Sequence, residues 1–297
     1  LCNKLLENNY EVIAYDDLSN GSGKMNLSEK VKFVNGDILD FKNLKNACKK
    51  MDVVFNLAVK PLVMSFHDPD QVVKVNDYGT YLVGKVCVET KTKLIHISSS
   101  EAYGSAISFR MKEKHPFLPT TIYAASKAAS ELYVRGFEKT DKLKMVVVRP
   151  FNSYGEFMRG DIYGAVFPKF YDRLVQKKVC TITGTGKQTR DFTYVEDTCE
   201  GIMLADQTKQ AIGNTFNIAQ GKETTINKIA QLMTQKYNEI MGANISSKFT
   251  YTKDRPGDVK RHLGDISNAK KILGYKPKIS LEEGITRFIE WNIQNHK

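Results

Sequence analysis

Tyr123 and Lys127 are the residues of this chain whose types and spacing best suit proton transfer. Residues four apart on a helix share one face, and the small, helix-favouring residues around this pair predict a helix. A nearby lysine ammonium lowers the pKa of a tyrosine, which can then take a proton from a sugar hydroxyl near neutral pH. This chemistry removes a hydride from an alcohol, and it needs a nicotinamide beside the pair.

A Tyr-x-x-x-Lys pair alone is a weak motif, because a lysine-rich chain contains it by chance. Its neighbours make it more specific. Residues 95–104 are predicted to form an apolar strand that ends in hydroxyls and a carboxylate, with Ser99 placed to share the hydrogen bond of Tyr123. Residues 145–152 are predicted to form another buried strand followed by a loop. The order of these features along the chain favours a reaction site.

Length and composition limit the possible classes of protein. The chain has 297 residues, of which 41% are hydrophobic, enough for one large domain or two modest ones. Its net charge is +11, but the lysines are dispersed and no nucleic-acid motif is present, so we expect no nucleic-acid partner. A basic surface would instead favour an anionic nucleotide substrate. No apolar run suggests a membrane span, and no signal peptide is recognisable.

Five cysteines are scattered along the chain without a Cys-x-x-Cys motif. Their spacing predicts neither a disulfide framework nor a zinc site, and we expect no metal. Free thiols in a reducing cytoplasm are the expected state. The five are Cys2, Cys48, Cys87, Cys180 and Cys199.

The first half of the chain alternates predicted strands and helices. Strands are expected over 11–15, 31–34, 53–57 and 93–97, with helical periodicity over 41–51 and 70–90. This alternation predicts an α/β fold with a Rossmann-like, doubly wound parallel sheet. We expect residues 1–150 to form a cofactor-binding domain. Residues 151–297 would form a smaller α/β substrate-binding region, some segments of which can return to the first sheet.

Asp16 follows the first predicted strand. In a dinucleotide-binding fold, an acid there holds the adenosine ribose about 20 residues after a Gly-rich turn. Counting back from Asp16 falls before residue 1, and residues 1–9 look like the rest of the helix that such a turn begins. We therefore expect the first strand and turn to be absent from this sequence, which would weaken cofactor binding. The alternative is a fold that never had them. A carboxylate at Asp16 favours NAD over NADP, because it repels a 2′-phosphate.

Along essentially its whole length the chain resembles the extended short-chain dehydrogenase/reductase family, the nucleotide-sugar epimerases and dehydratases. Residues 15–21 are similar to its ribose-binding loop, 36–38 to its adenine-contacting segment, 56–58 to a strand end beside the cofactor, and 75–80 to its Asn-x-x-Gly-Thr helix. The resemblance implies these cofactor contacts: Asp16, Asp17, Asn20, Asp37, Ile38, Leu57, Ala58, Asn76, Tyr123 and Lys127.

The second half carries the substrate segments of the same family, at 149–155, 164–170, 188–197 and 255–258. A guanidinium suits phosphate oxygens, and a carboxylate suits a ribose diol. Simpler alternatives remain: an Arg190–Asp191 ion pair, a plain turn over 255–258, Asn152 as a loop cap, and Glu101 directed at solvent. The resemblance implies these substrate contacts: Ser100, Asn152, Lys169, Arg190, Arg255 and Asp258.

The resemblance implies a shared first step, in which Tyr123 takes the C4 hydroxyl proton, Ser99 positions that hydroxyl and Lys127 holds the cofactor ribose. Ser100 stands where most 4,6-dehydratases of the family have Asp, whereas Glu101 resembles decarboxylases and GDP-mannose dehydratases. Against a decarboxylase, their late arginine is replaced by His262, which we expect to line the site or pack. We expect His67 and His115 in surface loops.

The pattern favours an NAD-dependent 4-epimerase acting on a UDP-hexose, with Ser99, Tyr123, Lys127 and Glu101 as catalytic residues. A 4,6-dehydratase and a UDP-glucuronate decarboxylase-like enzyme are alternatives, and a catalytically idle nucleotide-binding protein is a reading of another class. Dimers are usual in the family through helices matching 70–90 and 121–140, so we expect a cytoplasmic homodimer.

Overall fold

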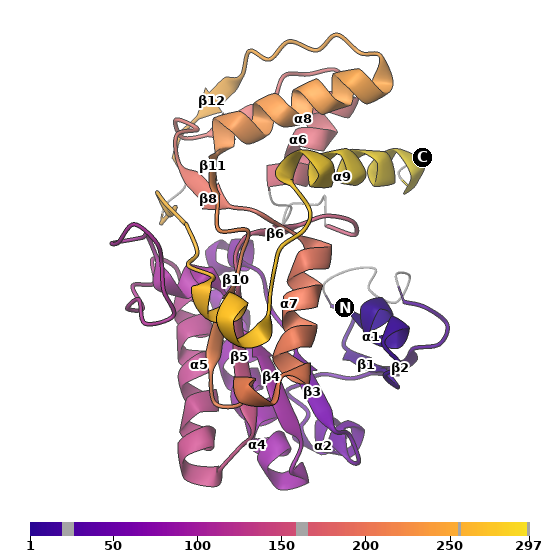
Figure 1. The fold of residues 1–297 in the computed structure, drawn as a ribbon, viewed down its shortest axis with the longest axis vertical. Helices are drawn as coiled ribbons and strands as arrows, with labels where there is room; N and C mark the ends of the chain where they lie inside the picture. Colours follow the sequence, from indigo (N-terminus) through magenta and orange to yellow (C-terminus); the bar gives the residue numbers. More distant parts are fainter. Residues whose placement is uncertain (20–26, 159–165, 255–256, 296–297) are drawn as a thin grey trace.

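The computed structural model describes residues 1–19, 27–158, 166–254 and 257–295, which form two lobes (Figure 1). The lower lobe in that view holds the central sheet and the helices packed on it. The upper lobe holds three helices from the second half of the chain, α6 (Val166–Val175), α8 (Ile226–Met241) and α9 (Leu281–Asn295).

Four parallel strands form the central sheet, in the order β10-β5-β4-β3. Their carboxyl ends therefore meet at one edge. A separate parallel pair consists of β1 (Ile13–Asp16) and β2 (Lys32–Asn35), and among the described residues β1 is bonded only to β2. The strands of the central sheet are β3 (Val53–Asn56), β4 (Lys93–Ile97), β5 (Met145–Pro150) and β10 (Thr215–Ile218).

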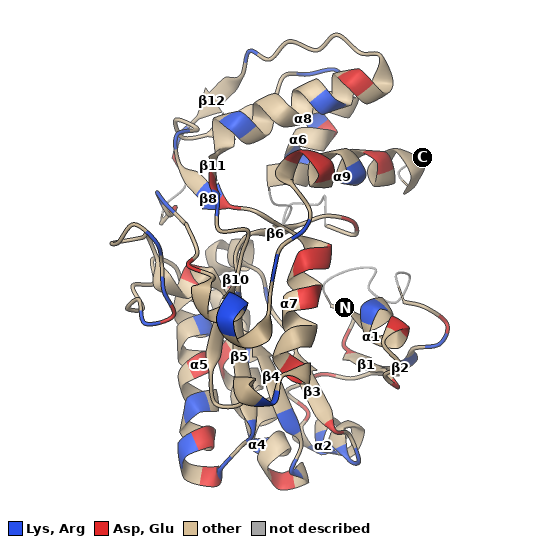
Figure 2. Ribbon diagram, in the orientation of Figure 1, with Lys and Arg blue, Asp and Glu red and all other residues tan. Residues whose placement is uncertain are grey.

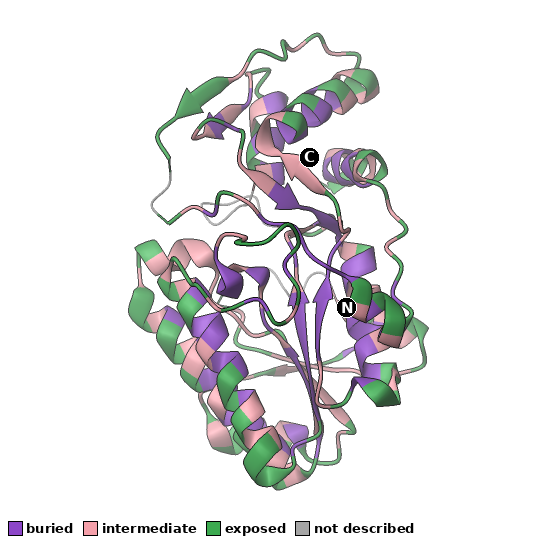
Figure 3. Cartoon of the chain, turned by 60° about the vertical axis from the view of Figure 1, so that its left-hand side comes forward, coloured by how far each residue is buried: buried purple, intermediate pink, exposed green. Residues whose placement is uncertain are grey.

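Helices cover both faces of the central sheet, because side chains along a strand alternate between its faces. Leu94 and Val147 belong to the core beneath α4 (Thr80–Thr90) and α5 (Ile122–Asp141). Ile95 and Val148 belong to the core on the opposite face, with α7 (Val195–Gln207) and the π-helical turn η6 (Ala269–Leu273). Figure 3 shows the strands buried between these layers. The predicted doubly wound α/β fold is confirmed.

The predicted helix over 70–90 is three consecutive helical segments, α3 (Pro69–Val72), the π-helical η3 (Val73–Gly79) and α4. Gly79 ends η3 where it passes close to Ile38. A Cβ at Gly79 would lie 2.4 Å from Ile38 Cδ1, so a larger residue here would displace the end of the Ile38 side chain. Among the described residues of this half, the other helical segments are α1 (Cys2–Glu7), α2 (Phe41–Cys48), η2 (Leu62–Phe66) and η4 (Ser100–Tyr103), besides α5.

The upper lobe has its own aromatic core, in which Tyr154 stacks on Phe167 with ring centroids 4.2 Å apart. Three short strand pairs border it: β6 with β9, β7 with β12 and β8 with β11. β10, in contrast, pairs with β5, so part of the second half belongs to the central sheet. The short elements are β6 (Ser153–Tyr154), β7 (Thr181–Thr183), β8 (Thr189–Asp191), β9 (Thr193–Tyr194), η5 (Lys209–Ala211), β11 (Glu223–Thr225) and β12 (Thr250–Thr252).

The structure confirms the predictions for the cysteines and for His67, but the prediction for His115 is wrong. All five cysteines are free; Cys48, Cys87 and Cys180 are buried, and the other two are half-buried. His115, expected in a surface loop, is only 9% exposed. Its Nε2 accepts the Ile107 N–H at 3.2 Å and its ring packs edge-on against Tyr103, so the ring serves a buried donor that its polar neighbours in sequence do not reveal. The surface position of His67 is confirmed.

Basic side chains are spread over both lobes rather than gathered in one stripe (Figure 2). Within the described ranges, no helix is both long enough and apolar enough to cross a membrane.

Candidate active site

One pocket gathers the residues that the sequence indicates for proton transfer. It has a volume of about 250 Å³ and lies where β3, β4 and β5 end and α5 begins. Its position follows from the parallel sheet, which brings the carboxyl ends of its strands to one edge. The lining residues are Leu57, Val59, Ile97, Ser98, Ser99, Ser100, Glu101, Tyr123, Lys127, Pro150, Asn152 and Ser153.

The start of α5 fixes the position of Tyr123. Thr121 caps the helix, and its side chain accepts the Ala124 N–H at 3.1 Å. The Tyr123 N–H donates to Ser65 Oγ at 2.9 Å, which attaches the same turn to η2. Lys127 follows one turn later and lines the same pocket, so the two side chains share a helix face as their spacing predicts.

Ser99 contacts the Tyr123 side chain by a hydrogen bond. Because Ser99 Oγ already accepts the Glu101 N–H at 3.1 Å, its own hydroxyl is free to donate to the phenol oxygen, which favours a phenolate. Burial nevertheless raises the pKa of Tyr123 to about 12; the Ser99 bond opposes this rise, and the Glu101 charge adds to it. The predicted lowering of this pKa by Lys127 is therefore wrong for this structure, because desolvation outweighs the favourable contacts.

The Lys127 ammonium is directed to the end of β4. The side chain is 3% exposed, and Nζ donates to the Ile97 carbonyl oxygen at 2.6 Å. Burial lowers the pKa of Lys127 to about 8, and the Glu131 carboxylate one turn further along α5 opposes that shift. Lys127 is thus a buried amine with a pKa near neutral, a state that suits a functional lysine.

A buried ion pair lies behind Lys127. Glu131 is fully buried and Arg149 is 3% exposed. Arg149 Nε donates to Glu131 Oε2 at 2.8 Å, and Nη1 donates to the Glu113 carbonyl at 2.8 Å. The guanidinium also lies over the Tyr103 ring, 4.6 Å from its centroid. This network ties the helix that carries Tyr123 and Lys127 to β5.

Glu101 lines the pocket, so the alternative in which it points away to solvent is wrong. Its side chain is 17% exposed, and Oε1 lies 3.8 Å from His262 Nδ1. Ser100 lies next to it and is 2% exposed. His262 is fully buried and packs edge-on against Phe151, which confirms the expected packing role.

Two buried polar atoms of the pocket-lining residues have no hydrogen-bond partner among the described residues. They are Ser98 Oγ and Asn152 Nδ2. A buried donor or acceptor without a partner is destabilising, so such groups at a pocket are candidate contacts for a polar ligand. Asn152 is one of the predicted substrate contacts, whereas Ser98 was not predicted.

The loop after β1 carries the predicted ribose contacts. Asp16 ends the strand, is exposed, and its Oδ1 accepts the Leu18 N–H at 2.7 Å. Asp17 Oδ1 accepts the Ser19 N–H at 2.9 Å. Lys60 Nζ donates to Ser19 Oγ at 2.6 Å, so this loop contacts the loop that follows β3 and carries Leu57 and Ala58. The predicted contact Asn20 lies outside the described residues.

Asn76 has a positioning role that its sequence motif does not specify. It is fully buried; Oδ1 accepts the Lys60 N–H at 2.7 Å, and Nδ2 donates to the Lys60 carbonyl at 3.0 Å and to Ser126 Oγ at 3.2 Å. Its polar atoms are thus satisfied within the protein. Of the predicted adenine contacts, Asp37 accepts the Leu39 N–H at 2.8 Å and Ile38 is 9% exposed within the core.

The remaining substrate candidates lie outside this pocket. Arg190 Nη2 and Asp258 Oδ1 are 2.9 Å apart, so the structure pairs these two with each other. The alternative Arg190–Asp191 pair is not formed, because the Asp191 carboxylate accepts the N–H groups of Gln220 and Gly221. Lys169 is exposed on α6. Arg255 lies outside the described residues.

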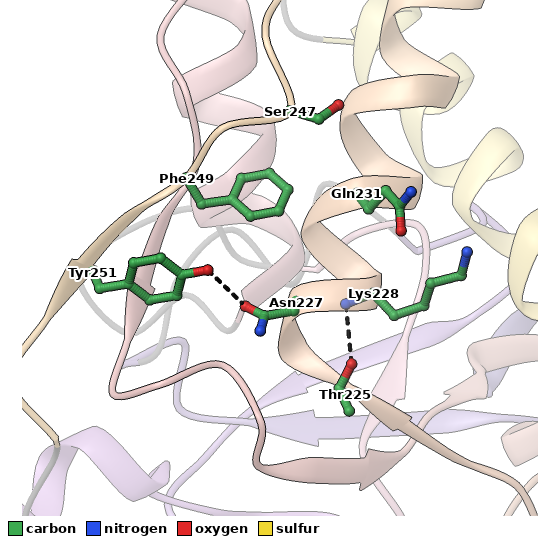
Figure 4. A pocket seen from close by; sticks show the side chains of 7 residues that line it. All are labelled: Thr225, Asn227, Lys228, Gln231, Ser247, Phe249 and Tyr251. Atoms are coloured by element: carbon green, nitrogen blue, oxygen red, sulfur yellow. Dashed lines mark hydrogen bonds between the residues drawn. The ribbon is translucent and has the colours of Figure 1, made fainter.

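A larger pocket of about 450 Å³ lies between α8 and the extended segment that contains β12 (Figure 4). Tyr251 donates to Asn227 Oδ1 at 3.3 Å there, and the Thr225 side chain accepts the Lys228 N–H at 3.2 Å as the cap of α8. None of the predicted catalytic residues borders it. The smaller pocket, where the titratable groups converge, is therefore the candidate active site.

Comparison with known proteins agrees with this geometry. A family model described as GDP-mannose 4,6 dehydratase matches residues 1–288. The chain is 32% identical to dTDP-D-glucose 4,6-dehydratase of Bos taurus, over 97% of this chain and 82% of that protein. It is 30% identical to UDP-glucose 4-epimerase of Mycolicibacterium smegmatis, over 98% of this chain and 93% of that protein.

A solved structure is also similar over nearly the whole chain. UDP-glucuronic acid 4-epimerase from Bacillus cereus, in complex with UDP-glucuronic acid and NAD, superposes with a TM-score of 0.89 and 28% identity, covering 99% of this chain and 95% of the other. The chain therefore belongs to the GDP-mannose 4,6 dehydratase family, within the epimerases and dehydratases of the extended short-chain dehydrogenase/reductase type.

Proposed function

We propose that this protein is an NAD-dependent nucleotide-sugar 4-epimerase that acts on a UDP-hexose. One observation carries the proposal: Ser99, Tyr123 and Lys127 line a single pocket in which Ser100 stands next to Glu101. The first three supply the proton transfer that C4 oxidation needs. Ser100 cannot act as the second carboxylic acid of a dehydratase pair, whereas an epimerase needs only return of the hydride to the other face.

The residues around the pocket fit NAD. The exposed Asp16 carboxylate at the end of β1 suits a ribose diol and repels a 2′-phosphate. The unpartnered Ser98 hydroxyl and the apolar Leu57, Val59 and Ile97 lie at the strand ends beside Lys127. When bound, NAD supplies the hydride acceptor for sugar C4.

The protein groups divide the remaining work. Tyr123 takes the C4 hydroxyl proton and later returns it, which requires its phenolate. Ser99 stabilises that phenolate and orients the sugar hydroxyl, and the Lys127 ammonium binds the cofactor ribose. The unpartnered Asn152 Nδ2 is placed to donate to a substrate oxygen. Arg190 and Asp258 would exchange their mutual ion pair for the diphosphate and the nucleotide ribose.

A 4,6-dehydratase is the second candidate, because Glu101 is present in the pocket and dehydratases are among the similar proteins. To test both, the protein is incubated with NAD and UDP-glucose or UDP-N-acetylglucosamine, and the products are identified by NMR and mass spectrometry. A C4 epimer supports the first candidate, and a product lighter by one water supports the second. Nucleotide binding without turnover would indicate an idle binding protein. Full activity in Tyr123→Phe would contradict the mechanism.

Apolar side chains on η3 and α5 support a homodimer formed through these helices. Tyr78 is 54% exposed, Leu132 57% and Tyr133 43%, values that are high for large apolar groups on adjacent helices. Light scattering of the wild type and of Leu132→Asp tests this: we expect the variant to be a monomer. A wild type that is monomeric at micromolar concentration would contradict the assignment.

A further inference from the structure

His96 lies in a buried row of polar side chains beside the helix that carries Tyr123 and Lys127. The register of β3 and β4 pairs Asn56 with His96, which places both side chains on the same face of the sheet. The helices α4 and α5 cover that face and supply the other two members of the row, Thr80 and Ser130. The four residues of the row are between 0% and 4% exposed, so we expect their polar atoms to bond to one another.

The hydrogen bonds at one end of this row have a fixed direction. Thr80 Oγ1 donates its only hydrogen to the Asn76 carbonyl oxygen at 2.8 Å, because a carbonyl oxygen can only accept. Thr80 Oγ1 can therefore only accept from Asn56, whose Nδ2 lies 3.2 Å away. The second hydrogen of that amide nitrogen remains for His96 Nδ1, at 3.4 Å. Nδ1 is therefore the acceptor and carries the lone pair of the ring.

The other end of the row leads independently to the same form of the ring. Ser130 Oγ donates to the Lys127 carbonyl oxygen at 2.9 Å, so it can only accept from His96 Nε2, at 3.2 Å. Nε2 therefore carries the ring hydrogen. A charged ring would set a second hydrogen, on Nδ1, against the donor of Asn56. Burial lowers the pKa of His96 well below its ordinary value, and the Lys127 charge lowers it further, so the ring stays neutral.

The row joins the end of β4 to the turn of α5 that carries Lys127. Two contacts connect these elements: His96 to Ser130 in the core, and Lys127 Nζ to the Ile97 carbonyl oxygen at the pocket. Ile97 directly follows His96 in β4, and Ser130 lies three positions after Lys127 in α5. The buried bond therefore fixes the separation of β4 and α5 at the point where the ammonium group reaches the pocket.

We propose that His96, in its neutral form with the hydrogen on Nε2, is a positioning residue that holds Lys127 for the cofactor ribose next to the reacting sugar. Lys127 shares the pocket with Tyr123, whereas Asp16 lies at the end of β1 and suits the adenosine ribose. The role in cofactor binding rests on the proposed function. The directions of the hydrogen bonds do not depend on it, which allows a separate test.

The first test is nitrogen NMR of the imidazole rings in the full chain without ligands, over about pH 6 to pH 9. The chain has five histidines, and His96→Gln assigns the His96 signals by their loss. We expect a neutral ring with its hydrogen on Nε2 throughout this range. A ring that gains a proton within the range, or that carries its hydrogen on Nδ1, would overturn the proposal whether or not the protein turns over a sugar.

Two variants then separate the two bonds of His96. A glutamine amide can place a donor near Nε2 and keep the bond to Ser130, whereas asparagine offers an acceptor near Nδ1 but is too short to reach Ser130. In calorimetric titration, His96→Asn should weaken NAD binding about tenfold, the effect of one hydrogen bond. His96→Gln should stay within about threefold of wild type. Equal NAD affinities in His96→Asn and wild type would overturn the proposal.

ADP distinguishes this positioning role from a general loss of structure. It carries the adenosine ribose and the diphosphate but lacks the ribose assigned to Lys127, so His96→Asn should leave its affinity unchanged. An equal loss of ADP and NAD affinity would contradict the proposal. Thr234→Val is the control, because it removes a buried hydroxyl that donates to the Ala230 carbonyl in the upper lobe and should change neither affinity. A selective loss of NAD affinity in a protein that turns over no sugar would contradict only the proposed reaction.

Discussion

Lys127 Nζ lies 2.6 Å from the carbonyl oxygen of Ile97, so the amine of α5 is bonded to the end of the neighbouring strand β4. The contact satisfies a strand-end carbonyl, but it also holds an ammonium group where only 3% of the residue is exposed. Burying a charge is unfavourable unless its contacts compensate, and the lowered pKa of Lys127 shows that here they do not fully compensate.

Lys127→Met should therefore abolish turnover yet unfold less readily than wild type at pH 7. The pKa of Lys127 falls from 10.5 in the unfolded chain to about 8 in the fold, so burial of the charge lowers the free energy of unfolding of the wild type by on the order of 3 kcal/mol. The variant removes this cost, but it also loses a hydrogen bond that contributes about 1 kcal/mol. Between these two values the unfolded chain binds more protons, so wild-type stability rises with pH. Urea unfolding should show that the free energy of unfolding of Lys127→Met exceeds that of wild type by more at pH 7 than at pH 10.

The control is Lys139→Met. Lys139 lies on the same helix, and its side chain is 79% exposed. Its stability relative to wild type should not change between the two pH values. A Lys127→Met protein that is less stable than wild type by the same amount at both pH values would show that burial of this charge is not unfavourable.

The pH dependence of turnover should report Tyr123. Its pKa is raised to about 12, so only a small fraction is phenolate near neutrality, and kcat/KM should rise with pH from about pH 6 to pH 8. Ser99→Ala removes the bond that opposes this rise in pKa, and should lower kcat/KM by about tenfold or more while keeping the upward slope. Ser105→Ala is a matched control outside the pocket. A flat profile in the wild type would remove Tyr123 as the base.

Much of the site follows from the sequence because its chemistry is local. Ser99 at a strand end and Tyr123 at a helix start are placed by secondary structure and by the rule that parallel strands end at one edge. The pKa of Tyr123 could not be predicted in the same way, because desolvation depends on the whole surrounding packing. The buried state of His115 likewise depends on one loop amide, that of Ile107.

Contacts between segments that lie far apart in the chain could not be predicted from the sequence either. Arg190 of β8 pairs with Asp258, which lies 68 positions later in the chain. Each motif predicts a contact with the substrate, and neither motif indicates that the two side chains pair with each other. Asn76 shows the same limit. Its motif marks it as important, but only the fold shows that its amide is occupied by Lys60 and Ser126.

Asn76→Leu should destabilise the fold and weaken NAD binding together. The substitution leaves the Lys60 N–H and carbonyl without their buried partner, at a cost of about 1–3 kcal/mol for each unsatisfied group. The loop after β3 would then lose its fixed position. Urea unfolding and calorimetric NAD titration measure the two effects. Asn43→Leu, which removes an exposed asparagine hydrogen-bonded to Asp40, should change neither by a comparable amount.

Substitutions of Arg190 and Asp258 should differ in which ligands they affect. Arg190→Met removes a donor suited to phosphate and should weaken UDP binding about tenfold to a hundredfold, as for a charge-assisted hydrogen bond, while leaving uridine binding nearly unchanged. Asp258→Asn should weaken UDP and uridine alike, because both carry the ribose diol. Calorimetric titration of each variant with both ligands distinguishes the roles. If Asp258→Asn instead strengthened UDP binding, Asp258 would be only a competing counterion that Arg190 releases when a diphosphate binds.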